Sequence, residues 1–323
     1  MPSSMSLSPV RVKLNFALTQ HHLGLLPMPV DYFSARPIVI LGAARSGTKL
    51  LRTLVGASSA TLATPYDMNF VWRWGNERVP HDALPADLAT PRVVRFIQQQ
   101  LAKSAGLKLG DQCTLVEKTV SNVLRVSFIR RVLPGARFVH IVRDGRDVVE
   151  SSLRCWREPP SAAYLIRKMR RFPFALCLPY AVKHAVRCVG KVFNHAGSVS
   201  SWGPRYDGID GDVKSQPLAY VCSQQWLRCI ESFENSRRSL GPSDLYEVRY
   251  EDLSLQPEQT ALALADWLHL PDPHRVANYA RALVTSANVG THVRLPKQDL
   301  ETTVRLLGPA LLRWRYYDDR LAA

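Results

Sequence analysis

Residues 37–54 read PIVILGAARSGTKLLRTL, and this stretch decides the fold. Its first part, residues 37–41, is an unbroken apolar run, which is typical of a strand buried on both faces of a sheet. A turn bracketed by glycines follows at residues 42–48, and leucines then recur at helical spacing. A strand, a tight turn and a helix in this order indicate the opening of a parallel α/β sheet.

Three further segments have the character of strands, at residues 115–116, 136–142 and 245–250. Helical patterns follow the last two of them, from Asp147 onward and over residues 257–269. Because strands alternate with helices and no repeat period is present, we predict one doubly wound α/β domain with four strands.

We assign this domain to residues 36–323, after an irregular arm with several prolines at residues 1–35. Lys and Arg are frequent among aromatic and apolar residues at 167–191, and a Gly/Ser/Pro-rich loop follows. We therefore predict a helical cap, inserted at residues 155–225 over the C-terminal edge of the sheet. An ordinary basic helical face is the alternative interpretation.

The composition favours a globular protein with anionic partners. Hydrophobic residues make up 46% of the 323 residues, which is enough for a sizeable core, and the formal net charge is +15 at pH 7. Such an excess of positive charge suits a nucleotide, an acidic polymer, nucleic acid or an anionic membrane surface. A solvated basic surface with no partner is the alternative.

Cysteine usage and hydropathy favour a cytoplasmic protein. Six cysteines form no C-x-x-C pair, so neither a zinc site nor a disulfide framework is indicated. The N-terminus lacks the pattern of a secretory signal, and the most apolar later segment, residues 172–193, is interrupted by charged residues. We expect no membrane span and no bound metal.

Residues 42–49 have the composition of an anion-binding loop. A tight turn between a strand and a helix points backbone N–H groups inward, and the helix N-terminus adds positive potential. Two glycines permit the close turn, two hydroxyls donate hydrogen bonds, and two cations add charge. In that order these residues are Gly42, Gly47, Ser46, Thr48, Arg45 and Lys49.

The loop is P-loop-like, but it does not match a Walker A motif. That motif requires a lysine followed by Ser or Thr after its last glycine, whereas Gly47 here is followed by Thr48 and then Lys49. No apolar strand ends in an aspartate suited to hold Mg²⁺. A P-loop kinase is therefore disfavoured, although it stays an alternative.

Arg45-Ser46-Gly47-Thr48 after an apolar strand resembles the 5′-phosphosulfate loop of sulfotransferases that use 3′-phosphoadenosine-5′-phosphosulfate (PAPS). The likeness is strongest to the tyrosylprotein and carbohydrate branch. A second element, residues 138–151, is similar to the family's 3′-phosphate site, in which an arginine ending a strand and a serine eight residues later hold the phosphate. Arg143 and Ser151 stand at these positions, and two helical turns let both border one crevice.

Two shorter elements agree with the resemblance. Glu117-Lys118-Thr119 is similar to the family's Lys-containing motif after a strand, and residues 248–253 resemble a segment whose tyrosine, here Tyr250, lies near the nucleotide. The C-terminal Arg-Lys-Gly signature of the cytosolic small-molecule branch is missing. The remaining candidates for a lid over the nucleotide are Ser286, Asn288 and Lys297.

The resemblance implies transfer of a sulfuryl group from PAPS to an acceptor hydroxyl, with fixed cations in place of Mg²⁺. Arg45 and Lys118 are then the candidates that stabilise the transferring group. The branch has a glutamate base a little over twenty residues after the loop arginine, and Asp67 is the candidate here. Asp67 could instead cap a helix that begins near Met68. Glu117 is a second candidate for the base.

His140 is a poorer candidate for the base, because it alternates with core residues along a strand. An aromatic and basic cluster after Asp67 could form a platform for the acceptor, or it could pack beneath the cap. Its members are Tyr66, Trp72, Arg73, Trp74 and Asn76.

The basic cap favours a carbohydrate or other polar acceptor, such as an anionic polysaccharide. A non-catalytic protein that binds polyanions or nucleic acid is the alternative from another class, but nucleic acid is not the partner we expect.

Overall fold

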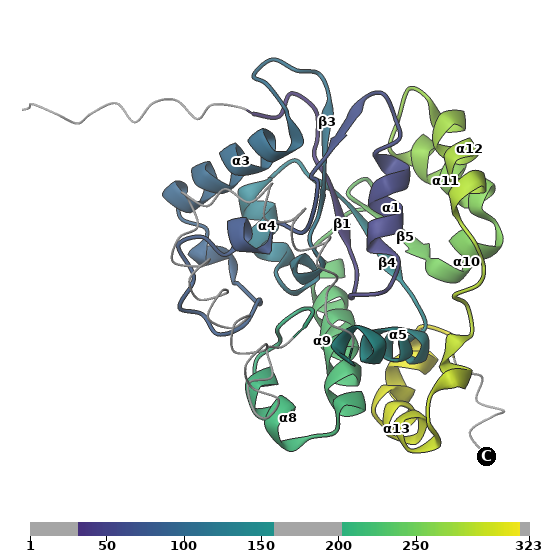
Figure 1. Ribbon diagram of the computed structural model, residues 1–323. Coiled ribbons are helices and arrows are strands. Elements are labelled where there is room, and N and C mark those ends of the chain that lie inside the picture. The colour runs from purple at the N-terminus through teal and green to yellow at the C-terminus, as the bar shows by residue number, and fades with distance from the viewer. Residues whose placement is uncertain (1–31, 158–201, 317–323) are drawn as a thin grey trace, which may run out of the picture. The chain divides into compact units, whose positions relative to one another are not determined.

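The computed structural model describes residues 32–157 and 202–316, and its centre is a parallel sheet (Figure 1). Five strands pair in the order β2-β3-β1-β4-β5, each parallel to its neighbours. The strands are β1 (Ile38–Leu41), β2 (Thr61–Ala63), β3 (Thr114–Lys118), β4 (Arg137–Val142) and β5 (Leu245–Arg249). The predicted P-loop-like parallel sheet flanked by helices is confirmed.

The predicted number of strands is wrong by one, because β2 was missed. This edge strand has only three residues and pairs with β3 alone, from Thr61 opposite Thr114 to Ala63 opposite Val116. A segment so short shows no periodicity of its own, so its extended form depends on the neighbouring strand.

Helices cover both faces of the sheet. Before β4 lie α1 (Thr48–Val55), α2 (Asn69–Trp72), η1 (Ala86–Leu88), α3 (Pro91–Ala105), η2 (Val120–Leu124) and α4 (Val126–Val132). After β4 lie α5 (Gly145–Arg157), α8 (Ile209–Ser215), α9 (Leu218–Arg237), α10 (Tyr250–Leu255), α11 (Pro257–Trp267), α12 (Pro273–Leu283), η4 (Thr291–Arg294) and α13 (Lys297–Arg313).

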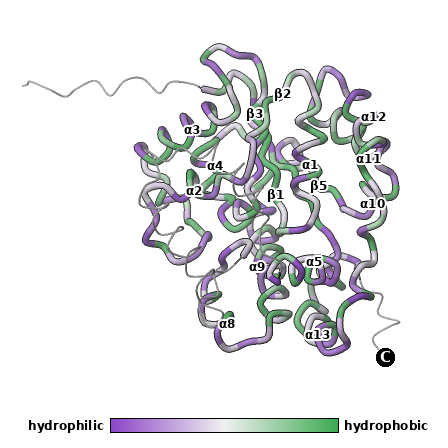
Figure 2. The backbone as a smooth tube through the Cα atoms, in the orientation of Figure 1, coloured by the Kyte–Doolittle hydropathy of each residue, from purple (hydrophilic) through white to green (hydrophobic). Residues whose placement is uncertain are grey.

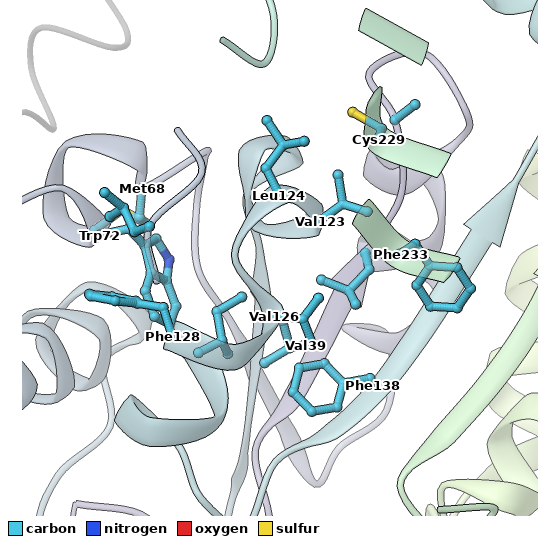
Figure 3. Close-up of a cluster of buried hydrophobic side chains, with 14 of the residues drawn as sticks. Val39, Met68, Trp72, Val123, Leu124, Val126, Phe128, Phe138, Cys229 and Phe233 are labelled. Carbon is cyan, nitrogen blue, oxygen red and sulfur yellow. The ribbon is translucent and has the colours of Figure 1, made fainter. Parts of the chain in front are cut away.

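Strand alternation creates two hydrophobic layers. Ile38 and Ile40 face α1, α11 and α12, whereas Val39 and Leu41 face the layer that contains α3, α4, α5 and α9. In Figure 2 the central strands are mostly hydrophobic, and Figure 3 shows Val39 and Phe138 of the sheet close to Phe233 of α9. Each such fully buried side chain contributes about 1.5–3 kcal/mol relative to exposure.

Two predicted segments lie largely outside the described residues. They are the arm at 1–35 and most of the cap at 155–225, with its basic stretch at 167–191. The predicted C-terminal limit of the cap, residue 225, falls inside α9, which packs against α5 and α13. The domain limits stay predictions.

The described segments hold no helix with both the length and the apolar composition of a membrane span. Four of the six cysteines lie in these segments and are free, namely Cys113, Cys155, Cys222 and Cys229.

Candidate functional site

The predicted site residues gather at the carboxyl ends of β1, β3, β4 and β5. The chain leaves β1 through α1 on one face of the sheet, and it leaves β3 and β4 through α4 and α5 on the other. Neighbouring strands whose connections diverge to opposite faces open a crevice at their carboxyl ends, which is where open α/β sheets bind ligands.

The loop after β1 is shaped by two glycines. A Cβ on Gly42 would lie 2.5 Å from the carbonyl oxygen of Ile141, and one on Gly47 would lie 2.6 Å from Cδ2 of Tyr250. Gly47 also has φ +93°, in the left-handed region that favours glycine. Arg45 adopts φ 70°, a strained value for a non-glycine residue and one that is concentrated at functional sites.

The loop ends at the N-terminus of α1. Gly47 is the N-cap and no side chain caps the helix, so the N–H groups of its first turn remain available to an anion. Thr48 is buried at this end, whereas Lys49 is exposed.

The two predicted phosphate elements touch each other directly. The Nε atom of Arg45 donates to Oγ of Ser151 at 2.9 Å, although the two residues are 106 positions apart. Arg143 donates from its guanidinium to the carbonyl oxygen of Arg45, also at 2.9 Å. The loop after β1, the end of β4 and the second turn of α5 therefore form one continuous surface.

Arg143 is buried and held in one orientation. Its guanidinium carbon lies 4.6 Å from the centre of the Tyr250 ring, and one terminal nitrogen donates to the carbonyl oxygen of Asn288. Oγ1 of Thr291 lies 3.5 Å from the same nitrogen. Tyr250 contacts both halves of the site, because its ring also covers Gly47.

Two polar atoms of this surface have no hydrogen-bond partner among the described residues. They are Oγ of Ser46 and Nε of Arg143, and both are buried. A buried donor left unpaired costs about 1–3 kcal/mol, and such atoms are rare in folded proteins. Phosphate or phosphosulfate oxygens would supply the acceptors that both atoms lack, so the site fits an anionic nucleotide.

Asp147 was missed by sequence reasoning. It is buried on α5 and accepts hydrogen bonds from the backbone N–H groups of Gly290 and His292 at 2.8 Å each, with Nδ1 of His292 at 2.7 Å. Burial acts to raise the pKa of Asp147, but the bonds from His292 and the charge of Arg143 outweigh it, and the pKa lies below its usual value. Its position one helical turn after Arg143 was the available signal.

Asp147 thus fastens residues 288–294 beside Arg143. Of the three lid candidates, only Asn288 is brought to the site, through its carbonyl oxygen. Ser286 is exposed, and Lys297 begins α13 with its side chain 92% exposed and Nζ 4.0 Å from Glu301.

Lys118 and Asp67 form an ion pair at the end of β3. Nζ of Lys118 lies 2.7 Å from Oδ1 of Asp67, and the side chains are 8% and 43% exposed. The lysine is thus enclosed while the carboxylate remains accessible from outside. The N-cap of α2 is Met68, and no side chain caps that helix, so Asp67 does not have the helix-capping role considered from the sequence.

Neither alternative base is accessible. Glu117 is fully buried and accepts hydrogen bonds from Trp72, Thr119 and Asn122; burial raises its pKa. His140 is also fully buried, and burial lowers its pKa to about 3.

The aromatic and basic cluster after Asp67 is mostly packed inside. Trp72 is fully buried and donates to Glu117, and Arg73 forms a buried ion pair with Asp82. Trp74 stacks on Phe96 with ring centroids 4.0 Å apart, and Asn76 is buried. The proposed platform is therefore wrong for Trp72, Arg73 and Asn76, whose burial leaves no face for an acceptor; Tyr66 is half-buried.

A model of the Sulfotransferase family matches residues 37–172 and 180–274, which together are well over half of the chain. The chain belongs to the sulfotransferase family. The resemblance based on four sequence elements is thereby confirmed at the level of the family. All four elements lie within the matched residues.

Curated proteins similar to this chain match it at low identity. The omega-hydroxy-beta-dihydromenaquinone-9 sulfotransferase Stf3 of Mycobacterium bovis is 24% identical over 178 residues, which cover 55% of this chain and 32% of that protein. The matched parts span less than half the length of the curated relatives.

Solved structures of sulfotransferases are also similar to this chain. A sulfotransferase domain from the olefin synthase of Synechococcus PCC 7002 has a TM-score of 0.48 at 15% identity, covering 88% of this chain and 96% of that one. A mouse sulfotransferase complexed with PAP has a TM-score of 0.44 at 12% identity and covers 87% of each chain.

Proposed function

We propose that this chain transfers a sulfuryl group from PAPS to a hydroxyl of a carbohydrate or other polar acceptor. The observation that carries the proposal is the direct contact between the two phosphate elements, in which Arg45 binds Ser151 and Arg143 binds the carbonyl of Arg45. Two anion sites joined in this way suit a nucleotide with phosphate at both its 5′ and 3′ positions.

The donor would be held by residues of both elements. Ser46, Gly47, Thr48 and the first turn of α1 would bind the 5′-phosphosulfate through hydroxyl and N–H groups, with Lys49 adding positive charge nearby. The 3′-phosphate would be bound by Arg143 and Ser151, with Tyr250 packing against the arginine. The buried, unpaired atoms of Ser46 and Arg143 support this assignment.

The chemistry assigned to the chain's own residues is charge stabilisation and proton transfer. PAPS supplies an activated sulfuryl group: the acceptor oxygen bonds to sulfur as the sulfur–oxygen bond to the 5′-phosphate breaks, and 3′-phosphoadenosine-5′-phosphate (PAP) is released. Arg45 and Lys118 would neutralise charge on the leaving phosphate. Asp67 would accept the proton of the acceptor hydroxyl.

The ion pair between Lys118 and Asp67 is consistent with these two roles, charge neutralisation by Lys118 and proton acceptance by Asp67. An anionic donor would give Lys118 a second partner, which leaves Asp67 free to accept a proton. Arg52 lies on the same side: its guanidinium donates to the carbonyl of Thr64 at 3.1 Å, and burial lowers its pKa while the negative charge of Asp67 acts to raise it. A cation beside the base and a net charge of +15 support an acceptor that is itself anionic, such as an acidic polysaccharide.

The first experiment measures donor binding and transfer. We expect PAP to bind in calorimetry without Mg²⁺, and sulfur-35-labelled PAPS to label one of three probe acceptors: chondroitin, a tyrosine peptide or p-nitrophenol. Binding of ATP that requires a metal, with no binding of PAP, would refute the proposal in favour of a kinase. Salt-sensitive binding of polyanions without transfer would favour the non-catalytic alternative.

A second experiment tests the assigned base. Asp67→Asn should lower kcat by about 10²–10⁴-fold while PAP affinity stays within about twofold. Asp87→Asn is the matched control, because Asp87 is an exposed carboxylate on η1. If Asp67→Asn is as active as the control, Asp67 is not the base.

A further inference from the structure

The end of β3 sends neighbouring side chains to opposite sides. Lys118 points to the candidate site and pairs with Asp67, whereas Glu117 and Thr119 point together into the buried interior. This alternation is the ordinary consequence of the two-residue repeat of a strand. One short segment therefore carries both a site residue and the scaffold behind it.

The hydroxyl of Thr119 connects this scaffold to the backbone beside Asp67. It accepts a hydrogen bond from the backbone N–H of Met68 at 2.8 Å and donates to Oε1 of Glu117 at 2.6 Å. Met68 is the N-cap of α2 and its own side chain makes no capping hydrogen bond, while Thr119 satisfies the backbone N–H of Met68.

Other buried groups also donate to Glu117. The carboxylate accepts from Nε1 of Trp72 at 3.1 Å and from Nδ2 of Asn122 at 2.7 Å, and both donors are fully buried. The backbone N–H of Met68 can only donate, so it takes a lone pair of the Thr119 hydroxyl, and the hydroxyl in turn donates to Oε1 of Glu117. The hydroxyl is thereby bonded on both sides.

We propose that Thr119 is a positioning residue for sulfuryl transfer, because its hydroxyl fixes the backbone of Met68 and so holds the neighbouring Asp67 against Lys118. This inference rests on the proposed function. Asp67 is nearly half exposed and its side chain could otherwise turn into solvent. A base that must meet the acceptor hydroxyl in one geometry gains from such a restraint.

The test compares three substitutions in the full chain. Thr119→Val removes the hydroxyl at nearly constant volume, and we expect kcat to fall by about 10–100-fold, with PAP affinity in calorimetry within about twofold of the wild type. Thr119→Ser retains the hydroxyl and should restore kcat to within about threefold of the wild type. The measured reaction is transfer from labelled PAPS to the probe acceptor that the wild type labels best.

Thr303→Val is the matched control. Thr303 is also fully buried, and its hydroxyl donates to the carbonyl of Asp299 at 2.7 Å within α13. This variant should lose thermal stability as Thr119→Val does, yet keep kcat. If Thr119→Val does not fold, Thr119→Cys replaces the hydroxyl by a weak acceptor of similar size and should lower kcat in the same way.

The outcomes separate the two proposals. A wild-type protein that neither binds PAP nor transfers sulfate contradicts the proposed function. An active wild type whose kcat is unchanged by Thr119→Val contradicts only the positioning role. Equal losses of kcat and PAP affinity, or a loss that Thr119→Ser does not reverse, would make Thr119 a structural residue and would also overturn the inference.

Discussion

Arg143→Ala tests whether this arginine recognises the 3′-phosphate. The guanidinium is buried, one of its nitrogens already binds Arg45, and its Nε atom has no partner among the described residues. A hydrogen bond to a charged group contributes about 1.5–3 kcal/mol, so the loss of one or two phosphate contacts costs about 3 kcal/mol. That corresponds to a rise of roughly a hundredfold in the Kd of PAP.

Calorimetry with two nucleotides isolates the phosphate contact. PAP carries the 3′-phosphate and adenosine 5′-monophosphate (AMP) lacks it, so the difference between their affinities reports that group alone. We expect Arg143→Ala to remove most of this difference while the affinity for AMP stays within about twofold. Arg143→Lys keeps the charge but loses the planar fork. Its difference in affinity between PAP and AMP should therefore lie between that of the wild type and that of Arg143→Ala.

An equal loss of affinity for PAP and AMP would refute the reasoning. It would mean that Arg143 acts by supporting the loop through the carbonyl of Arg45, without contacting the 3′-phosphate. Unchanged affinity for both nucleotides would remove Arg143 from the binding site altogether. Thermal unfolding of both variants shows whether the fold is retained, and Arg143→Lys keeps the test valid if Arg143→Ala unfolds.

Gly47→Ala should destabilise the protein by at least about 1–2 kcal/mol, because an L-residue is strained at φ +93° and its Cβ meets the Tyr250 ring. In urea unfolding, adding Tyr250→Leu to Gly47→Ala should recover only the part of the lost stability that comes from the contact with the ring. Full recovery of the stability would contradict the backbone strain. Burial lowers the pKa of His140 from 6.5 to about 3. The unfolded chain therefore binds the extra proton first, and stability is lost as pH falls from 6.5 toward 3, by up to about 1.4 kcal/mol per pH unit. His140→Phe should reduce that slope in urea unfolding across pH, and an unchanged slope would argue against a neutral buried ring. Asp147→Asn should speed hydrogen exchange of residues 288–294, because an amide offers one acceptor oxygen where the carboxylate offers two; protection equal to the wild type would mean that other contacts hold this segment.

The gathering of the candidate phosphate-binding residues at one edge of the sheet could be predicted, because each follows a strand. Arg45, Arg143 and Tyr250 each stand where a strand ends, and the carboxyl ends of parallel strands meet at one edge of the sheet. Periodicity therefore placed these residues at strand ends without knowledge of the strand order, and the family resemblance marked them as candidates for nucleotide binding. The three-residue β2 was missed for the opposite reason, because its pairing with β3 is not local.

The residues expected to contact the acceptor were harder to predict, because burial decides which of their side chains are accessible. Trp72 and Arg73 stand close to Asp67 in sequence and have the composition of a binding platform, yet the interior network of Glu117 and Asp82 takes up both. Which residues of a helix are buried depends on the face that it turns toward the sheet. The four residues of α2 are too few for a hydrophobic pattern to predict that face.

The sequence by itself determined the strand–loop–helix at residues 37–54 and the parallel sheet, and its resemblance to the family marked two candidate phosphate-binding elements, since each motif consists of residues close together in the chain. Only the tertiary structure decided that Arg45 binds Ser151, that Asp147 fastens residues 288–294, and that Thr119 restrains Met68. These contacts join residues 51 to 145 positions apart. They depend on strand order, on register and on the direction of each buried hydrogen bond, which no local pattern encodes.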